Sequence, residues 1–73
     1  MKKYVVLQGN MTSQGTGDYW TVDAFNNFEE AFECMQNVSE DIKGITKHPH
    51  GYLETVIFDI DDNEDIASLK YHY

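Results

Sequence analysis

Residues 25–44, FNNFEEAFECMQNVSEDIKG, contain the clearest structural pattern in the chain. Apolar residues recur at spacings of three and four, as they do on one face of an α-helix. They are Phe28, Ala31, Phe32, Met35, Val38 and Ile42. Asn27 is a suitable N-cap, and Glu30, three residues later, completes a capping-box pattern. The stretch therefore predicts a helix, with Phe32 and Met35 in the hydrophobic core.

Two β-strands are expected before this helix and two after it. Residues 3–10 and 18–25 are rich in β-forming side chains, and the segment MTSQGTG between them favours a hairpin connection. Residues 52–60 and 66–73 have the same character. The polar segment DDNED, residues 61–65, separates them and indicates a second hairpin.

The order strand, strand, helix, strand, strand predicts one α+β domain over residues 1–73. We expect a two-layer ββαββ fold, in which a four-stranded antiparallel sheet packs on one helix. Strand order 2-1-3-4 makes every neighbouring pair antiparallel. In the second strand, alternation places Trp20, Val22 and Ala24 on the core face.

One helix covers only one face of such a sheet. The first and third strands look apolar on both sides, so the other face would expose a large apolar surface. We therefore expect this face to bind either a second copy of the chain, giving a homodimer, or a partner protein. The strand edges offer a second route to a partner, by β-augmentation.

Charge is the strongest global property of the chain. Thirteen acidic residues oppose five lysines without any arginine, and the net charge is −8. Nucleic acids and anionic membranes attract Lys and Arg, so neither is an expected direct partner. A basic protein surface is the expected partner, because complementary fields speed association. The alternative is that the charge serves solubility alone.

Cysteine usage and hydropathy indicate a cytoplasmic protein. Cys34 is the only cysteine, so no disulfide can form within the chain, and small secreted domains usually need such cross-links. No segment approaches the roughly 20 apolar residues of a membrane span. The first residues, MKKYVVLQGN, lack the apolar run of a signal peptide.

Three groups of side chains are candidates for partner binding. They are an acidic helix face, an acidic hairpin tip and two tyrosines in the last strand. The candidates are Glu29, Glu33 and Glu40, then Asp61, Asp62 and Glu64, and finally Tyr71 and Tyr73. Tyrosine is common at binding hot spots but is also favoured in strands, and the carboxylates could equally form a solvated surface.

Two patterns raise the question of a metal. Oxygen-bearing side chains alternate at Asp59, Asp61, Asn63 and Asp65, like the start of a calcium loop. Glu64 and Lys70 stand where that loop needs glycine and glutamate, so a hairpin turn is the expected structure. The histidines His48, His50 and His72, with Cys34, have no convincing zinc spacing. We therefore expect no metal, no cofactor and no catalysis.

Two resemblances suggest a class of function. The strand hairpin followed by FNNFEEAFECM, over residues 3–43, resembles the ββα opening of partial ribonuclease-H-like antitoxins, although their proline-glycine-cysteine segment before the helix is absent. In size, charge and architecture, the whole chain resembles the small acidic inhibitors that phages and mobile elements use against host defence, including anti-CRISPR proteins. This second resemblance implies an inhibitor that occupies a basic, nucleic-acid-handling surface, with nucleic-acid mimicry as one means. The alternatives are a toxin-neutralising antitoxin and an oligomeric small-molecule sponge.

Overall fold

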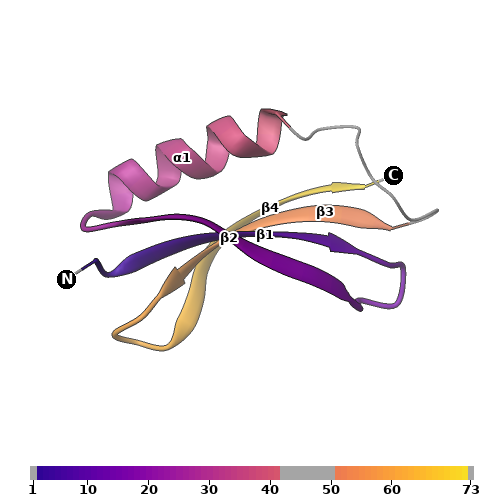
Figure 1. Ribbon diagram of the computed structural model, residues 1–73, viewed down its shortest axis with the longest axis horizontal. Helices are drawn as coiled ribbons and strands as arrows, with labels where there is room; N and C mark the ends of the chain where they lie inside the picture. Colours follow the sequence, from indigo (N-terminus) through magenta and orange to yellow (C-terminus); the bar gives the residue numbers. More distant parts are fainter. Residues whose placement is uncertain (1, 42–50, 73) are drawn as a thin grey trace.

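The computed structural model describes residues 2–41 and 51–72 and shows the expected order of elements (Figure 1). Two strands precede a single helix and two follow it, which confirms the predicted ββαββ fold. The elements are β1 (Tyr4–Met11), β2 (Gly17–Phe25), α1 (Phe28–Asp41), β3 (Tyr52–Asp59) and β4 (Glu64–His72).

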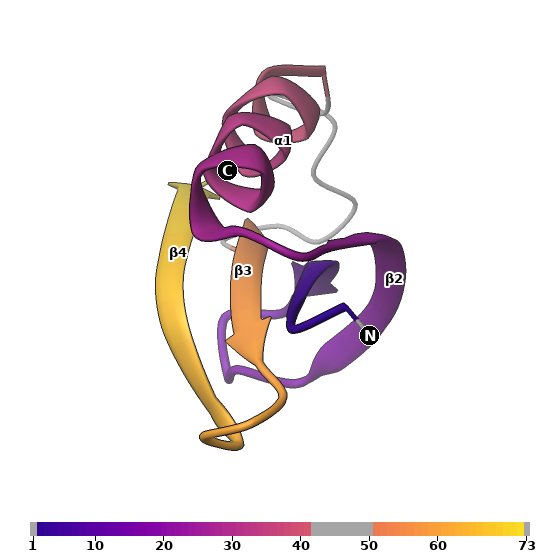
Figure 2. The ribbon, with the colours of Figure 1, turned by 90° about the vertical axis from the view of Figure 1, so that its left-hand side faces the viewer.

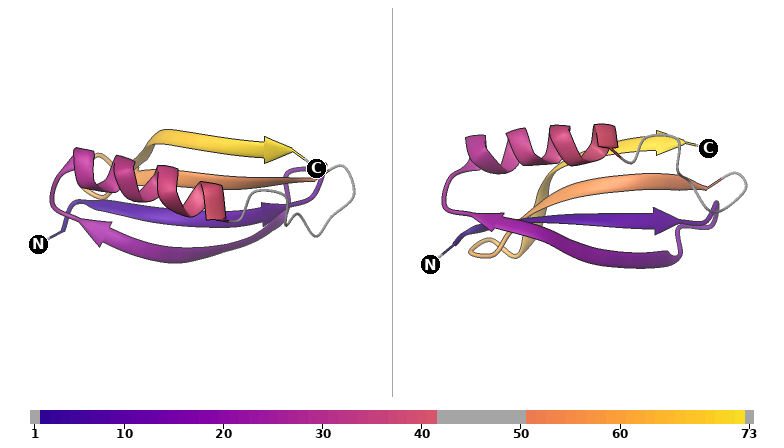
Figure 3. Two further views of the ribbon diagram at one scale, coloured as in Figure 1. Left: turned by 90° about the horizontal axis from the view of Figure 1, so that it is seen from above. Right: turned by 45° about the horizontal axis from the view of Figure 1, so that its top comes forward.

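The four strands form one antiparallel sheet in the order β2-β1-β3-β4, as predicted. The apolar strands β1 and β3 are central because their side chains need cover on both faces. Figure 2 shows α1 on one side of the sheet, and Figure 3 shows it running along the strands. The sheet is strongly twisted, so the β3–β4 turn swings away from the helix (Figure 1).

The sheet thus has two unlike faces. We call the side under α1 the covered face; it includes Val6 of β1 and Ile57 of β3, which are register partners. We call the opposite side the open face; it includes the next residues along each strand, Leu7 and Val56, also register partners. Period-two alternation assigns the other β1 and β3 side chains to these faces.

The start of α1 follows the capping pattern of the sequence. The backbone N–H of Glu30 donates to Oδ1 of Asn27 at 2.8 Å, and Nδ2 of Asn27 donates to Oε1 of Glu30 at 2.7 Å. These bonds satisfy one of the amide groups that a helix N-terminus leaves unpaired. The predicted end of the helix at residues 42–44 lies outside the described residues.

The core lies between α1 and the covered face. Val6, Ala31, Met35 and Ile57 are at most 1% exposed. Met35 confirms its prediction, whereas the prediction for Phe32 was wrong, since 37% of that residue is exposed. Phe32 lies about 100° around the helix from Ala31, at the margin of the buried stripe.

A β-bulge in β2 changes which of its side chains meet the core. The register with β1 shifts at Val22, which has no partner of its own. After this shift, Ala24 lies opposite Val5 on the open face, and Phe25 packs against the core instead. The prediction that placed Ala24 on the core face was therefore wrong, because an extra residue inverts strict alternation. Trp20 lies on the covered side but remains 43% exposed.

Gln8 brings a polar group into the covered face and is only 4% exposed. Its Nε2 donates to the carbonyl of Val38 at 3.1 Å and to Oγ1 of Thr55 at 3.4 Å. Its Oε1 accepts from Nε1 of Trp20 at 3.3 Å. One side chain therefore links β1, β2, β3 and α1, and its polar atoms are satisfied inside the protein.

Candidate protein-binding surfaces

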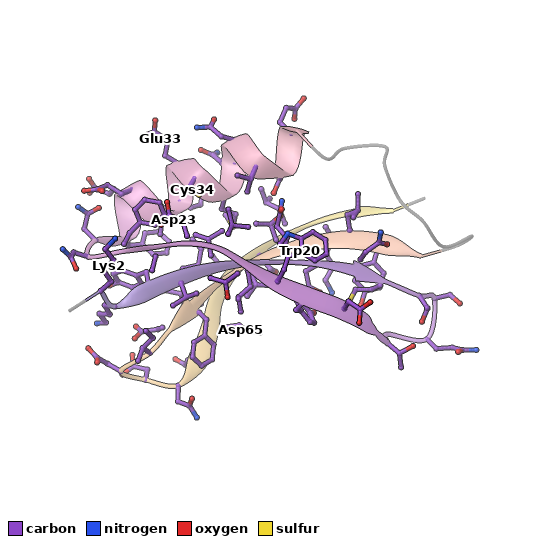
Figure 4. All side chains as sticks on the ribbon, viewed as in Figure 1. Lys2, Trp20, Asp23, Glu33, Cys34 and Asp65 are labelled. Atoms are coloured by element: carbon purple, nitrogen blue, oxygen red, sulfur yellow. The ribbon has the colours of Figure 1, made fainter. Side chains whose placement is uncertain are left out.

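Three glutamates form an acidic row along the outer side of α1. Glu29, Glu33 and Glu40 are all exposed, and Figure 4 shows Glu33 pointing away from the sheet. They lie on the side of α1 opposite the buried Ala31 and Met35, as the helical period requires. The ion pairs among the described residues join Lys3 to Asp59 and to Asp61. No described lysine therefore forms an ion pair with the acidic row. The predicted helix candidates therefore share one exposed side of α1.

The tip of the β3–β4 hairpin carries the second group of candidates, Asp61 and Asp62 in the turn and Glu64 at the start of β4, all of which are exposed. Asp59 organises the turn, because its Oδ1 accepts from the backbone N–H of Asp61 at 3.0 Å and of Asp62 at 3.2 Å. Nζ of Lys3 lies 3.6 Å from Asp59 Oδ2 and 3.9 Å from Asp61 Oδ2. The tip is thus less negative than its sequence suggests, whereas no ion pair among residues 2–41 and 51–72 opposes the acidic row.

The hydrogen bonds of Asp59 give a structural role to the first residue of the calcium-loop-like pattern Asp59, Asp61, Asn63 and Asp65. Asp59 is 4% exposed and its Oδ1 is already used by two backbone donors, so it serves the turn. Asn63 has a φ of 57°, a conformation that asparagine tolerates in tight turns. Within residues 2–41 and 51–72, no three His, Cys, Asp or Glu side chains are grouped as metal ligands. His48 and His50 lie outside the described residues.

Cys34 lies on the flank of α1 and packs partly against the core. Burial, and secondarily the charge of Asp23, raises the pKa of its thiol. Figure 4 shows these two residues on the same side of the molecule, between α1 and β2. A thiol with a raised pKa holds little thiolate at neutral pH and is a weak nucleophile.

The open face carries a hollow that sequence reasoning did not locate. It has a volume of about 300 Å³ and is lined by one or two residues from each strand: Leu7, Tyr19, Val56, Phe58 and Asp65. Despite the absence of a helix on this side, Val56 is only 3% exposed and Met11 only 4%. The open face is therefore less exposed than its apolar sequence led us to expect.

Tyr19 supplies part of the cover on this face, because it reaches from the edge strand across β1. Its hydroxyl donates to Oε2 of Glu54 on β3 at 3.0 Å. A Cβ on the intervening Gly9 would lie 2.7 Å from the Tyr19 ring, so only glycine lets the ring pack directly against the β1 backbone. Burial, followed by the hydrogen bond and the charge of Glu54, raises the Tyr19 pKa from 10.0 to about 12.

A pair of aromatic rings forms a second apolar surface, beside the acidic row. The rings of Phe28 and Phe32 have centroids 5.7 Å apart, and the Phe28 ring meets Tyr4 of β1 edge-on at 5.9 Å. With Glu29, the two phenylalanines line a shallow depression of about 270 Å³. In the sequence, Phe28 and Phe32 each stand directly before a glutamate of the acidic row, but their three- and four-residue spacing places them in the apolar stripe of the helix.

The structure brings some of the predicted candidates together and separates others. The first turn of α1 and the β3–β4 turn lie at the same end of the molecule, with the sheet between them (Figures 1 and 3). Tyr71 belongs to β4 opposite Leu53, which lies toward the other end of β3. Tyr73 lies outside the described residues.

Comparison with known proteins gives this chain no relatives. No family model matches the sequence, no curated protein resembles it significantly, and no solved structure matches its fold. In the part of the chain that the structure describes, no helix has the length and apolar character that crossing a membrane requires. A functional proposal for this chain therefore has to start from its surfaces.

Proposed function

We propose that this chain is a small acidic inhibitor that binds a basic surface of a partner protein, in particular of a nucleic-acid-handling host-defence complex in the cytoplasm. The observation that carries the proposal is the acidic row, in which Glu29, Glu33 and Glu40 are exposed and no described lysine neutralises them. A partner surface rich in Lys and Arg is complementary to such a row.

The spacing of the acidic row supports occupation of a nucleic-acid site. Along the helix axis, Glu29 and Glu33 are separated by about 6 Å, and Glu33 and Glu40 by about 10 Å. A rigid helix presents these charges in fixed positions, so little order is lost when they meet a basic groove. The carboxylates would then occupy positions where phosphates normally bind.

Binding rather than catalysis is also favoured by the chemistry of the described residues. Cys34, a potential nucleophile, has a thiol pKa raised by burial and by Asp23. Burial, followed by the hydrogen bond and the charge of Glu54, raises the Tyr19 pKa to about 12, which opposes formation of a phenolate. Neither group is shifted toward neutral pH, where it could act as a nucleophile or a base, so both stay protonated there.

Two triple variants test the proposal by removing the same number of charges from different places. One variant replaces Glu29, Glu33 and Glu40 with glutamine, and the matched control changes Asp61→Asn, Asp62→Asn and Glu64→Gln. The partner is first isolated by affinity purification from the native host. Association kinetics are then measured at about 50 and about 200 mM salt.

We expect the helix triple variant to slow association about tenfold at the lower salt and to flatten the salt dependence, because steering acts mostly on the on-rate. The tip variant should have a smaller effect, since Lys3 already opposes part of that charge. Unfolding free energies should change little, because these positions are exposed. If neither variant alters association, the carboxylates serve solubility alone and the proposal fails.

A further inference from the structure

The hollow on the open face differs from the acidic row in being mainly apolar. Leu7 and Val56 of the two central strands contribute aliphatic groups, and the rings of Tyr19 and Phe58 contribute aromatic surface. Asp65 of β4 adds a carboxylate. The hollow therefore combines an aliphatic surface, two rings and one anion.

The aromatic wall of the hollow is held in place before any ligand arrives. Tyr19 is fixed at one end by its bond to Glu54 and lies directly over Gly9. A preorganised wall lowers the entropy cost of binding, because its side chain needs no further ordering. The site is thus suited to a ligand that stacks on a ring.

The charge of Asp65 is unopposed in the described part of the chain. Asp65 forms no ion pair there, and it lies opposite Phe58 in the sheet. Lys70 lies opposite Glu54, which is four residues, or about 13 Å, from Phe58 along β3. The Nζ atom of Lys70 lies over the Tyr52 ring, 5.2 Å from its centroid. The hollow therefore presents a net negative charge beside apolar surface.

We propose that this hollow binds an arginine side chain of the partner protein. The aliphatic stem of an arginine would pack against Leu7, beside the almost buried Val56, its planar guanidinium would stack on an aromatic ring, and Asp65 would accept its hydrogen bonds. Lysine has no plane to stack and fits less well. A second copy of this chain cannot supply the group, because the chain contains no arginine and carries a charge of −8.

This inference rests on the proposed function, since it names the group that a basic partner would insert. It is tested on the isolated protein with the peptide acetyl-Gly-Arg-Gly-amide. The matched probes are the same peptide with citrulline, which is neutral and nearly isosteric, and with lysine. Binding is followed by the shifts of backbone amide signals in NMR spectra, for the native chain and for Asp65→Asn. The control is Asp18→Asn, an equal charge change on the exposed edge strand β2.

We expect saturable shifts at Leu7, Tyr19, Val56 and Phe58, with a dissociation constant on the order of 1 mM because a single side chain buries little area. Asp65→Asn should weaken binding about tenfold, and Asp18→Asn less than about twofold. The citrulline peptide should not bind, and the lysine peptide should bind several-fold more weakly than the arginine peptide.

Several results would overturn the inference. They are equal binding of the arginine and citrulline peptides, equal effects of the two asparagine variants, shifts centred on Phe28 and Phe32, and no saturable shift up to about 10 mM peptide. Equal affinity for the lysine peptide would remove the claim for arginine. None of these outcomes contradicts the proposed role of the acidic row, which the two triple variants test independently of the hollow.

Discussion

The covered and open faces of the sheet are built from similar sequences but are buried by different means. On the covered face, α1 places Ala31 and Met35 against Val6 and Ile57, and all four are at most 1% exposed. On the open face, the ring of Tyr19 crosses β1 and leaves a hollow of about 300 Å³ beside Val56. A helix can exclude water almost completely, whereas a single tyrosine gives partial cover and a place to bind.

The largest expected effect concerns the helix side of the covered face. Met35→Ala should lower the free energy of unfolding by about 2–5 kcal/mol, the range for a large buried side chain, because Met35 is 1% exposed. Phe32→Ala should cost only about 1–2 kcal/mol, because Phe32 is 37% exposed. Urea unfolding measures both. Equal losses would show that Phe32 is as deeply packed as Met35.

The next prediction compares the same substitution on the two faces. Val6→Ala should cost about 2–3 kcal/mol, because Val6 is 0% exposed within the core under α1. Val56→Ala should cost about 1 kcal/mol, because Val56 borders an existing hollow and is not part of the core cluster under α1. Chemical denaturation of the two variants provides the comparison. A larger loss from Val56→Ala would reverse our ranking of the faces.

A third prediction concerns the cover that Tyr19 provides. Gly9→Ala should cost about 1 kcal/mol in the native chain, because the new Cβ would lie 2.7 Å from the Tyr19 ring and displace it. In a Tyr19→Ala background the same change should be neutral or stabilising, because alanine orders a strand better than glycine does. A double-mutant cycle measures this coupling. Additive effects would mean that Tyr19 does not depend on Gly9.

The smallest expected effect is a pH dependence on the open face. The pKa of Tyr19 is raised from 10.0 to about 12, chiefly by burial and then by Glu54. The folded state holds the proton of Tyr19 more tightly than the unfolded state does. The contribution of this tyrosine to folding stability is therefore complete below pH 10 and is lost as the pH rises toward about 12. NMR titration of the Tyr19 ring measures the pKa directly.

Glu54→Gln is the matched variant for this titration. It removes the carboxylate but keeps a hydrogen-bond acceptor, so the Tyr19 pKa should fall while remaining above 10.0 through burial. An unchanged pKa would show that Glu54 has no influence on the phenol.

The sequence by itself determined the elements and their arrangement. The apolar spacing from Phe28 to Val38 and the Asn27–Glu30 cap specify where the helix starts and which side of it packs on the sheet, although not that Phe32 stays exposed at the margin of that side. The two-sided apolar character of β1 and β3 specifies central strands, and hence the order β2-β1-β3-β4. These features are local or periodic, so they can be read along the chain. The exposed positions of Glu29, Glu33 and Glu40 follow from the same helical period.

Only the tertiary structure decided the features that depend on contacts between distant residues. The bulge at Val22 inverts the sides of Ala24 and Phe25, and no local signal distinguishes it from regular alternation. Tyr19 meets Glu54, 35 positions along the chain, and Lys3 meets Asp59, so the partial cover of the open face and the reduced negative charge of the tip both arise from folding. The hollow depends on all four strands at once. Such sites arise from sheet twist and cross-strand register, which bring together side chains that the sequence keeps far apart.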